Sequence, residues 1–272
     1  MTPTPSQTRT WPVLSGLRAL AGAQSSLPAT RTALLADGPV EYVRAGDGKP
    51  AVVLVGGFGM PIEGWALVLG QLARVSTVLA YNRLGVGASA QPQQPQTGTV
   101  VVDLLRDLLD AAAIAPPYVL VGHALGGLHA TLFARRFPQK TAGIVLLEAV
   151  HPDDEFDERR LRFLPQSYRP RGSRKGVRRH DELHFLAETA SEIEQAGPFP
   201  DVPLTVVSAS RTPPRWTTSP QQVSTHAARQ RQLVALSAHG THVFAPATGQ
   251  FPQVTDPEIV VGAVREIVVG TR

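Results

Sequence analysis

Short apolar runs alternate with longer amphipathic stretches along most of this chain. Residues 51–55 and 118–121 are apolar or aromatic at every position, which is typical of strands buried on both faces of a sheet. Residues 99–113 carry apolar side chains three and four positions apart, the period of an amphipathic helix. The pattern predicts strands at residues 39–44, 51–55, 77–81, 118–121, 143–148, 204–208 and 243–245. It predicts helices at residues 65–72, 99–113, 125–137, 181–195, 221–236 and 256–269.

Strands that alternate with helices predict an α/β fold, in which helices cover both faces of a mostly parallel, doubly wound sheet. In such sheets the chemistry lies beyond the carboxyl ends of the strands. The alternation is interrupted over residues 151–200, which are charged and rich in proline, and it is missing before residue 36. We therefore expect a disordered or loosely docked tail at 1–35, one domain over 36–272, and an insertion at 151–200.

A sharp turn is predicted after the strand at residues 118–121. Gly122 and Gly126 bracket Ala124, which is the spacing of the G-x-S-x-G nucleophile elbow. The central residue of such an elbow has a strained backbone, at a cost of about 1–3 kcal/mol that persists mostly where function requires it. The methyl group of Ala124 cannot attack a carbonyl. The sequence thus predicts the elbow without its nucleophile.

Four glycine-containing loops follow predicted strands in a characteristic order: 56–59, 81–89, 122–127 and 248–251. Together they resemble the α/β-hydrolase superfamily of serine ester hydrolases over residues 36–272. The resemblance implies the α/β-hydrolase fold, with residues 151–200 as a small lid between the sixth and seventh strands. It also implies an oxyanion hole formed by the backbone N–H groups of Phe58 and Leu125.

The chain departs from the superfamily pattern at each of these loops. Ala124 stands at the nucleophile position and Gln250 at the position of the catalytic histidine, while Asn82 replaces an aspartate and Gly56 a histidine. A glutamine side chain cannot accept a proton near neutral pH. Loss of one member of a catalytic triad lowers turnover by on the order of a millionfold. An oxyanion hole alone still gives roughly 10³–10⁴-fold over water.

Other polar residues at the predicted carboxyl edge are candidates for remaining chemistry. Glu148 ends the sixth strand, where some branches of the superfamily place the triad acid, and we expect it to reach Gln250. The alternative is a strand-end carboxylate that accepts loop N–H groups. Gly57 and His151 are expected to line the pocket, and His151 is the histidine we consider for chemistry. His239 and His242 precede the last predicted strand, so both are interpreted as structural.

Composition excludes several classes of function. The net charge of +4 comes from a basic run at residues 159–179, which lacks the interleaved aromatic residues and the motif of a nucleic-acid binder. No run approaches the roughly 18 apolar residues of a membrane span. The chain has no cysteine, so it has no disulfide and no thiolate nucleophile. We expect no metal and no cofactor, and a cytoplasmic location because an export signal is not convincing; the oligomeric state stays open.

The leading hypothesis is a hydrolase-like protein without its nucleophile and base. It would be non-catalytic or very weakly active and would bind a small carbonyl-containing ligand. One alternative is an active hydrolase or lyase that uses Glu148 or His151 to activate water. Others are an inactivated variant of a serine hydrolase and an interaction module that uses residues 159–179.

Overall fold

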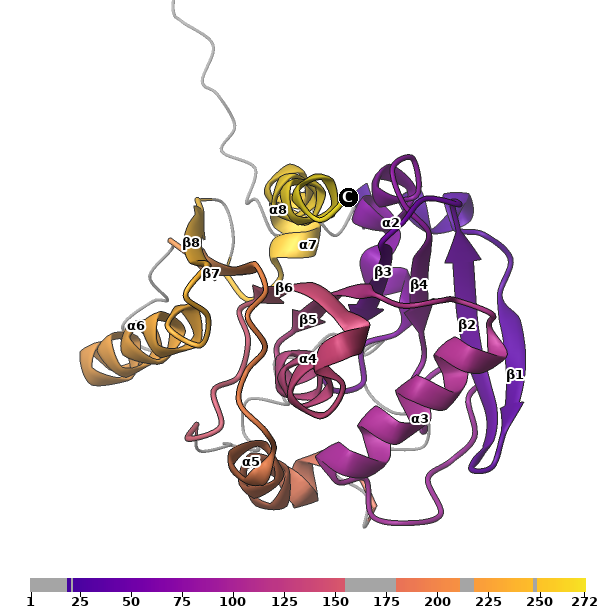
Figure 1. Ribbon diagram of the computed structural model, residues 1–272, viewed down its shortest axis with the longest axis horizontal. Coiled ribbons are helices and arrows are strands. Elements are labelled where there is room, and N and C mark those ends of the chain that lie inside the picture. The colour runs from indigo at the N-terminus through magenta and orange to yellow at the C-terminus, as the bar shows by residue number, and fades with distance from the viewer. Residues whose placement is uncertain (1–18, 21, 155–179, 211–217, 247–248) are drawn as a thin grey trace, which may run out of the picture.

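The computed structural model of the protein describes residues 19–20, 22–154, 180–210, 218–246 and 249–272. These residues form a sheet of eight strands in the order β1-β2-β4-β3-β5-β6-β7-β8 (Figure 1). The pairs β1–β2 and β2–β4 are antiparallel, and the other neighbours are parallel. The strands are β1 (Arg31–Leu35), β2 (Gly38–Ala45), β3 (Ala51–Val55), β4 (Val78–Tyr81), β5 (Tyr118–His123), β6 (Thr141–Leu147), β7 (Leu204–Ala209) and β8 (Gly240–Ala245).

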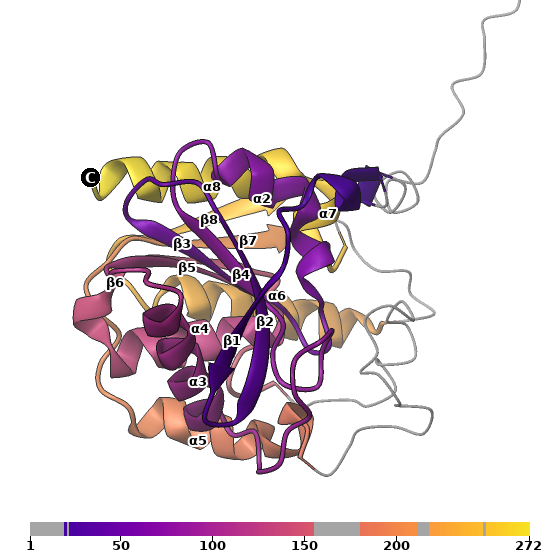
Figure 2. The ribbon, with the colours of Figure 1, turned by 90° about the vertical axis from the view of Figure 1, so that its right-hand side faces the viewer.

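Helices cover both faces of the sheet. On one face lie α2 (Ala66–Leu72), α7 (Pro252–Thr255) and α8 (Pro257–Gly270), and on the other lie α3 (Gly98–Ala111), α4 (Leu125–Arg136), α5 (Leu186–Gln195) and α6 (Pro220–Val234) (Figure 2). Short 3₁₀ turns are η1 (Gln24–Ser26), η2 (Ile62–Trp65), η3 (Pro138–Lys140) and η6 (Glu182–Phe185). This arrangement confirms the predicted α/β fold with a mostly parallel, doubly wound sheet.

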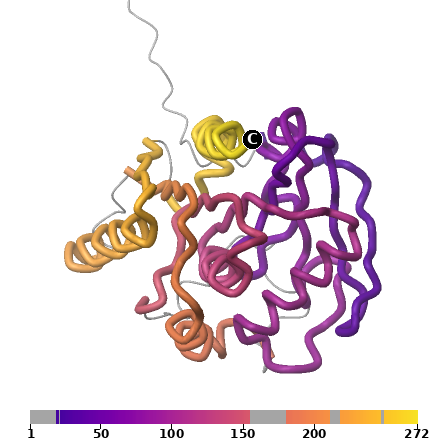
Figure 3. The backbone as a smooth tube through the Cα atoms, in the orientation of Figure 1, coloured from indigo at the N-terminus to yellow at the C-terminus, as the bar shows by residue number. Residues whose placement is uncertain are grey.

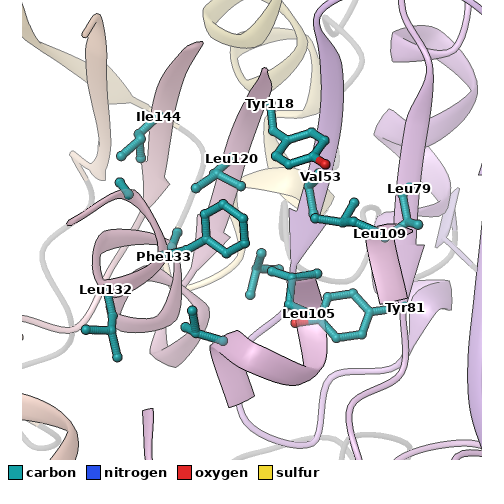
Figure 4. Close-up of a cluster of buried hydrophobic side chains, with 14 of the residues drawn as sticks. Val53, Leu79, Tyr81, Leu105, Leu109, Tyr118, Leu120, Leu132, Phe133 and Ile144 are labelled. Carbon is teal, nitrogen blue, oxygen red and sulfur yellow. The ribbon is translucent and has the colours of Figure 1, made fainter. Parts of the chain in front are cut away.

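The central strands divide the core into two layers. Because successive side chains of a strand point to opposite faces, Val53 packs toward α3 and α4 while Val52 packs toward α2 and α8. Figure 4 shows the first layer, where the rings of Tyr118 and Phe133 lie beside Leu120. Each fully buried side chain of this size contributes about 1.5–3 kcal/mol relative to exposure. The uninterrupted apolar runs of the sequence are thus explained by burial on both faces.

The two edges of the sheet differ from the prediction. Residues 31–35, expected in the tail, form β1, which pairs with β2 as a hairpin, so the domain begins before residue 36. Only Ala33 of β1 is buried and Leu34 is 84% exposed, so no apolar pattern identifies this strand. At the opposite edge β8 begins at Gly240, three residues before the predicted start. The two edges lie on opposite sides of the tube drawing in Figure 3.

The insertion between β6 and β7 is described for residues 151–154 and 180–200. Its helix α5 packs against α3 and α4. Thr189 Oγ1 accepts a hydrogen bond from Gly98 N–H at 2.8 Å, and Glu192 Oε2 accepts one from Thr99 N–H at 2.8 Å. These oxygens satisfy N–H groups at the start of α3 that have no carbonyl partner within the helix. The basic run at 159–179 lies outside the described residues.

None of the helices formed by the described residues is long and apolar enough to cross a membrane.

Gly126 allows the start of α4 to approach β3 closely. A Cβ atom at Gly126 would fall well inside van der Waals distance of the carbonyl oxygens of Val55 and Gly56. We expect Gly126→Ala to lower the free energy of unfolding by about 1–3 kcal/mol, the usual cost of overpacking. A Cβ atom at Gly262, in α8, would meet no neighbouring atom within 4 Å. Gly262→Ala should therefore raise the free energy of unfolding by about 1 kcal/mol. Urea denaturation of both variants measures the difference, and equal effects would contradict this packing.

Candidate active site

Ala124 forms the tip of the turn between β5 and α4. Its φ of 48° and ψ of −119° lie outside the regions that residues with a Cβ atom prefer. Three hydrogen bonds hold the tip: Ala124 N–H donates to Leu147 O at 3.0 Å, and Ala124 O accepts from Gly127 N–H at 2.9 Å and Val150 N–H at 3.1 Å. The residue is only half-buried. Its backbone therefore has the geometry expected of a nucleophile elbow, with a methyl group at the tip.

The loop after β3 lies directly beside this tip. A Cβ atom placed on Gly57 would be 3.3 Å from the Cβ of Ala124, so the two residues are neighbours in space. Arg83 holds this loop: its Nη1 donates to Gly56 O at 2.6 Å and its Nη2 to Gly57 O at 2.8 Å. In a planar trans peptide the C=O and the following N–H point in opposite directions. By fixing Gly57 O, Arg83 therefore also fixes the direction of the Phe58 N–H.

Leu125 supplies the second amide that was expected in an oxyanion hole. It is the first residue of α4, so its N–H has no carbonyl one turn earlier within the helix. The positive end of the helix dipole lies at the same place, which favours negative charge there. Phe58 and Leu125 thus belong to the two segments that flank Ala124, as the resemblance implied; their role as oxyanion donors stays a prediction.

Arg83 also forms a buried ion pair with Glu182 of the insertion. Arg83 Nε lies 2.5 Å from Glu182 Oε1 and Nη2 lies 3.0 Å from Oε2, with side-chain exposures of 5% and 9%. Burial is the largest influence and raises the pKa of Glu182, but the charge of Arg83, the interaction with His129 and the hydrogen bond from Arg83 together outweigh it and keep this pKa below its usual range. The sequence analysis did not find Glu182, because its partner is 99 positions away in the chain.

Asn82 occupies the position where the superfamily pattern has an aspartate, and its hydrogen bonds explain why an amide suits this position. Its Nδ2 donates to Glu41 Oε2 at 2.6 Å, and its Oδ1 accepts from Ile62 N–H at 2.8 Å. An aspartate would instead face the carboxylate of Glu41, and two like charges in contact repel each other. The amide therefore matches its neighbour on β2.

His123 packs behind the elbow between aromatic rings. It is 2% exposed, and its ring centroid lies 6.4 Å from that of Trp65 and 5.3 Å from that of Phe251. Burial lowers its pKa to about 4, so the imidazole is neutral at pH 7. Its Nε2 is 2.8 Å from the backbone oxygen of Gln250, to which a neutral ring can donate.

The prediction of a hydrogen bond between Glu148 and Gln250 is wrong. Gln250 is exposed, and its contact with the elbow is the backbone oxygen that meets His123. Glu148 Oε1 instead accepts from Ala209 N–H at 2.6 Å, and Oε2 lies 3.2 Å from His226 Nε2. The first contact is that of a strand-end carboxylate, although its donor is the last residue of β7 and not the expected loop N–H group. The second involves a histidine of α6 that the sequence analysis passed over, because nothing in its local pattern distinguishes it.

His151 lies at the predicted edge of the sheet but is turned toward its own loop. Its Nδ1 accepts a hydrogen bond from Asp153 N–H at 3.2 Å, and its side chain is 14% exposed. Burial lowers the pKa of this imidazole. A neutral ring whose Nδ1 accepts carries its proton on Nε2. The second nitrogen of His151 is therefore a donor here, which does not suit a general base.

The placement of His242 also corrects the sequence analysis. It lies within β8 rather than before it, and its Nε2 is 2.9 Å from Ser208 Oγ. Ser208 is 4% exposed in an extended strand, where its Oγ also lies 3.3 Å from Gln230 Oε1 of α6. This serine lacks the exposed tip that an elbow gives a nucleophile. His239 precedes β8 as expected and pairs with Asp201 at 3.2 Å.

Two hollows differ greatly in size and place. A small, partly enclosed cavity of about 10 Å³ lies between Phe58, Arg83 and Glu182, which is room for about one water molecule. An open hollow of about 640 Å³ lies at the amino ends of the strands, next to Pro117, Thr141 and Pro203. The larger hollow is thus at the opposite edge of the sheet from Ala124. Within the described ranges, no three His, Asp or Glu side chains are grouped so as to hold a metal ion.

Comparison with known proteins identifies the family. A family model described as the alpha/beta hydrolase fold matches residues 50–223. The chain therefore belongs to the α/β-hydrolase fold family, which confirms the resemblance seen in the sequence.

The share of a relative's length that this chain covers differs between relatives. The chain is 22% identical over 224 residues to the uncharacterized protein YqjL of Bacillus subtilis, which covers 82% of this chain and 85% of YqjL. It spans only 23% to 42% of the length of several further curated relatives.

Two solved structures share the fold at low sequence identity. The carboxylesterase CesB of Bacillus subtilis has a TM-score of 0.66 and 14% identity, covering 96% of this chain and 99% of CesB. The enol-lactonase of Burkholderia xenovorans has a TM-score of 0.64 and 17% identity, covering 88% of this chain and 100% of that enzyme.

We expect Glu182→Gln to lower the free energy of unfolding by about 3–5 kcal/mol, because it leaves the Arg83 guanidinium buried without its counter-ion. The matched control is Asp103→Asn, which removes a carboxylate that bridges Arg106 and Arg136 in pairs whose side chains are 28% to 34% exposed. That change should cost no more than about 1 kcal/mol. Chemical denaturation at pH 7 compares the two variants, and similar costs would show that the Arg83–Glu182 pair is not buried as described.

Proposed function

We propose that this protein is a non-catalytic or very weakly active homologue of serine ester hydrolases that binds a small carbonyl-containing ligand at the elbow. The observation that carries the proposal is the backbone of Ala124. A strained turn costs about 1–3 kcal/mol and persists where function requires it. Here the strain is retained although the side chain at the tip has no hydroxyl group.

The ligand class follows from the groups around the tip. Phe58 and Leu125 offer backbone N–H groups beside a half-buried methyl group, and a carbonyl oxygen is the natural acceptor for such a pair. Relatives of the same fold include a carboxylesterase and an enol-lactonase, whose names denote work on ester carbonyl groups. Without a hydroxyl at Ala124 no acyl-enzyme forms by the serine route, so the ligand is held rather than cleaved through a covalent intermediate.

The insertion acts as the lid of this site in our proposal. Glu182 of the insertion binds Arg83, and Arg83 binds the two carbonyl groups that precede Phe58. A movement of the insertion would therefore change the direction of the Phe58 N–H. Lid position and carbonyl binding are coupled through a single guanidinium group.

Reaction with a fluorophosphonate probe, which labels activated serines, tests the loss of the serine route. We expect neither the wild type nor Ala124→Ser to be labelled, because Gln250 cannot take the proton from a serine hydroxyl. Intact-protein mass spectrometry detects the adduct. Labelling of Ala124→Ser would show a base within reach of the tip and would end the proposal.

Ligand binding is measured separately with butyramide, an uncleaved carbonyl probe. Titration should shift the backbone amide resonances of Phe58 and Leu125 in nuclear magnetic resonance spectra. The control is Gly57→Val, whose Cβ would lie 3.3 Å from that of Ala124 and fill the space beside it. Shifts that persist in Gly57→Val, or that occur away from both amides, would place the ligand elsewhere.

A further inference from the structure

Strand β8 forms one edge of the sheet, and among the described residues no strand pairs with its outer side. Along a strand, the backbone groups of alternate residues point to the same neighbour. Ala245 O accepts a hydrogen bond from Ser210 N–H at 3.0 Å, so Ala245 and Val243 face β7. The N–H and C=O groups of His242 and Phe244 therefore point away from the sheet, along its open edge.

This edge lacks three features by which proteins usually prevent pairing between edge strands. Those features are proline, charged side chains and bulges. The residues of β8 include no proline, acid, lysine or arginine, and the register of β8 with β7 is regular. Burial and the charge of Arg231 lower the pKa of His242 against the opposing charge of Glu148, so this imidazole is neutral at pH 7. Strand β1 at the opposite edge differs, because it carries the charge of Arg31 and packs against α3.

An exposed aromatic ring lies on the same strand. Phe244 is 57% exposed, whereas every residue of the central strand β5 is buried. Residues two apart in a strand lie on one face of the sheet. Accordingly, the ring centroids of Phe244 and His242 are only 4.3 Å apart, with their planes inclined by 36°. The edge thus combines outward-facing backbone groups with a pair of stacked rings.

Side-chain hydrogen bonds hold this edge strand from within the domain. His242 Nε2 lies 2.9 Å from Ser208 Oγ of β7, and that oxygen lies 3.3 Å from Gln230 Oε1 of α6. On the other face of the sheet, Thr241 Oγ1 lies 3.0 Å from Thr205 Oγ1. A strand that is already ordered loses little conformational entropy when it binds a partner, which favours association.

We propose that two copies of this chain associate by antiparallel pairing of β8 with β8, which continues the sheet across a two-fold axis at Val243. In this register, His242 of one copy lies directly opposite Phe244 of the other. Two such residues, whose backbone groups face each other, exchange both of their N–H···O bonds. All the outward-facing groups of His242 and Phe244 are then paired. The same surface serves both copies, as a two-fold interface requires.

Helix α6 adds area to this interface. A stable interface usually buries about 800 Å² on each partner, which is more than one edge strand supplies. Helix α6 lies beside β8 at the same edge of the molecule (Figure 1), so continuation of the sheet brings α6 of one copy close to α6 of the other. The helix exposes uncharged polar side chains, which are typical of an interface rim: Gln221, Gln222, Ser224 and Thr225.

Sedimentation equilibrium of the full chain tests the association, and we expect a reversible equilibrium between monomer and dimer. Phe244→Lys should raise the dissociation constant by about 10-fold or more, because lysine on an edge strand opposes pairing. Phe244 is exposed, so its replacement leaves folding intact. The matched control is Leu34→Lys, which adds the same charge at an exposed apolar residue of β1 and should leave the constant unchanged. A wild type that stays monomeric, or equal effects of the two variants, would overturn the inference.

Single cysteines test the register, because the chain has no cysteine of its own. In this register the two Val243 residues form a non-hydrogen-bonded pair with Cα atoms about 4.5 Å apart, a distance that a disulfide bond spans. Val243→Cys should therefore cross-link the dimer under mild oxidation, as intact-protein mass spectrometry detects. The control is Thr241→Cys, which is on the same face and more exposed, but its two copies lie four residues apart along the strands, about 13 Å. Cross-linking of both variants, or of neither, would contradict the proposed pairing.

Discussion

The backbone of Ala124 is the constraint on which the rest of the site depends. Its positive φ lets β5 end and α4 begin within one residue, so that the first N–H groups of the helix point at the carboxyl edge of the sheet. The turn is held by the close contact of Gly126 with β3 and by the hydrogen bonds of Ala124 with Leu147 and Val150. These supports act on the main chain and are indifferent to the side chain at position 124. The shape of a hydrolase elbow can therefore persist without a hydroxyl group.

Arg83 connects that turn to the insertion between β6 and β7. One guanidinium group binds two loop carbonyls and a buried carboxylate, and a pair of this kind is costly to break because a lone charge would stay buried. The pair is therefore better suited to fixing geometry than to adding net stability. On the other side of the elbow, α6 is held by Gln230, whose Nε2 donates to Ala149 O, and by the ion pair of Arg229 with Asp153. Side-chain contacts therefore hold the elbow's surroundings on both sides.

The sequence predicted the features that a local residue pattern encodes, namely buried strands, amphipathic helices and the sharp turn at Ala124. Buried strands such as 51–55 appear as apolar runs, and the bracket of Gly122 and Gly126 located the turn. Edge strand β1 was missed, because it buries one residue and shows no alternation. The partners of Glu182 and Glu148 were missed or misassigned, because side chains distant in the chain meet only in the folded sheet. Gln250 had a plausible reach, yet its backbone rather than its amide side chain meets the elbow.

The most direct test of a strained elbow compares the free energies of unfolding of two variants. One is Ala124→Gly, and the other is Ala228→Gly in the interior of α6. Glycine adopts a positive φ without penalty, so relief of strain should raise the free energy of unfolding by about 1 kcal/mol at position 124. In a helix interior the same change should lower it by about 1 kcal/mol. Urea denaturation at pH 7 gives both values. Opposite signs are the result we predict, whereas a loss of stability of equal size at both positions would contradict a strained turn at Ala124.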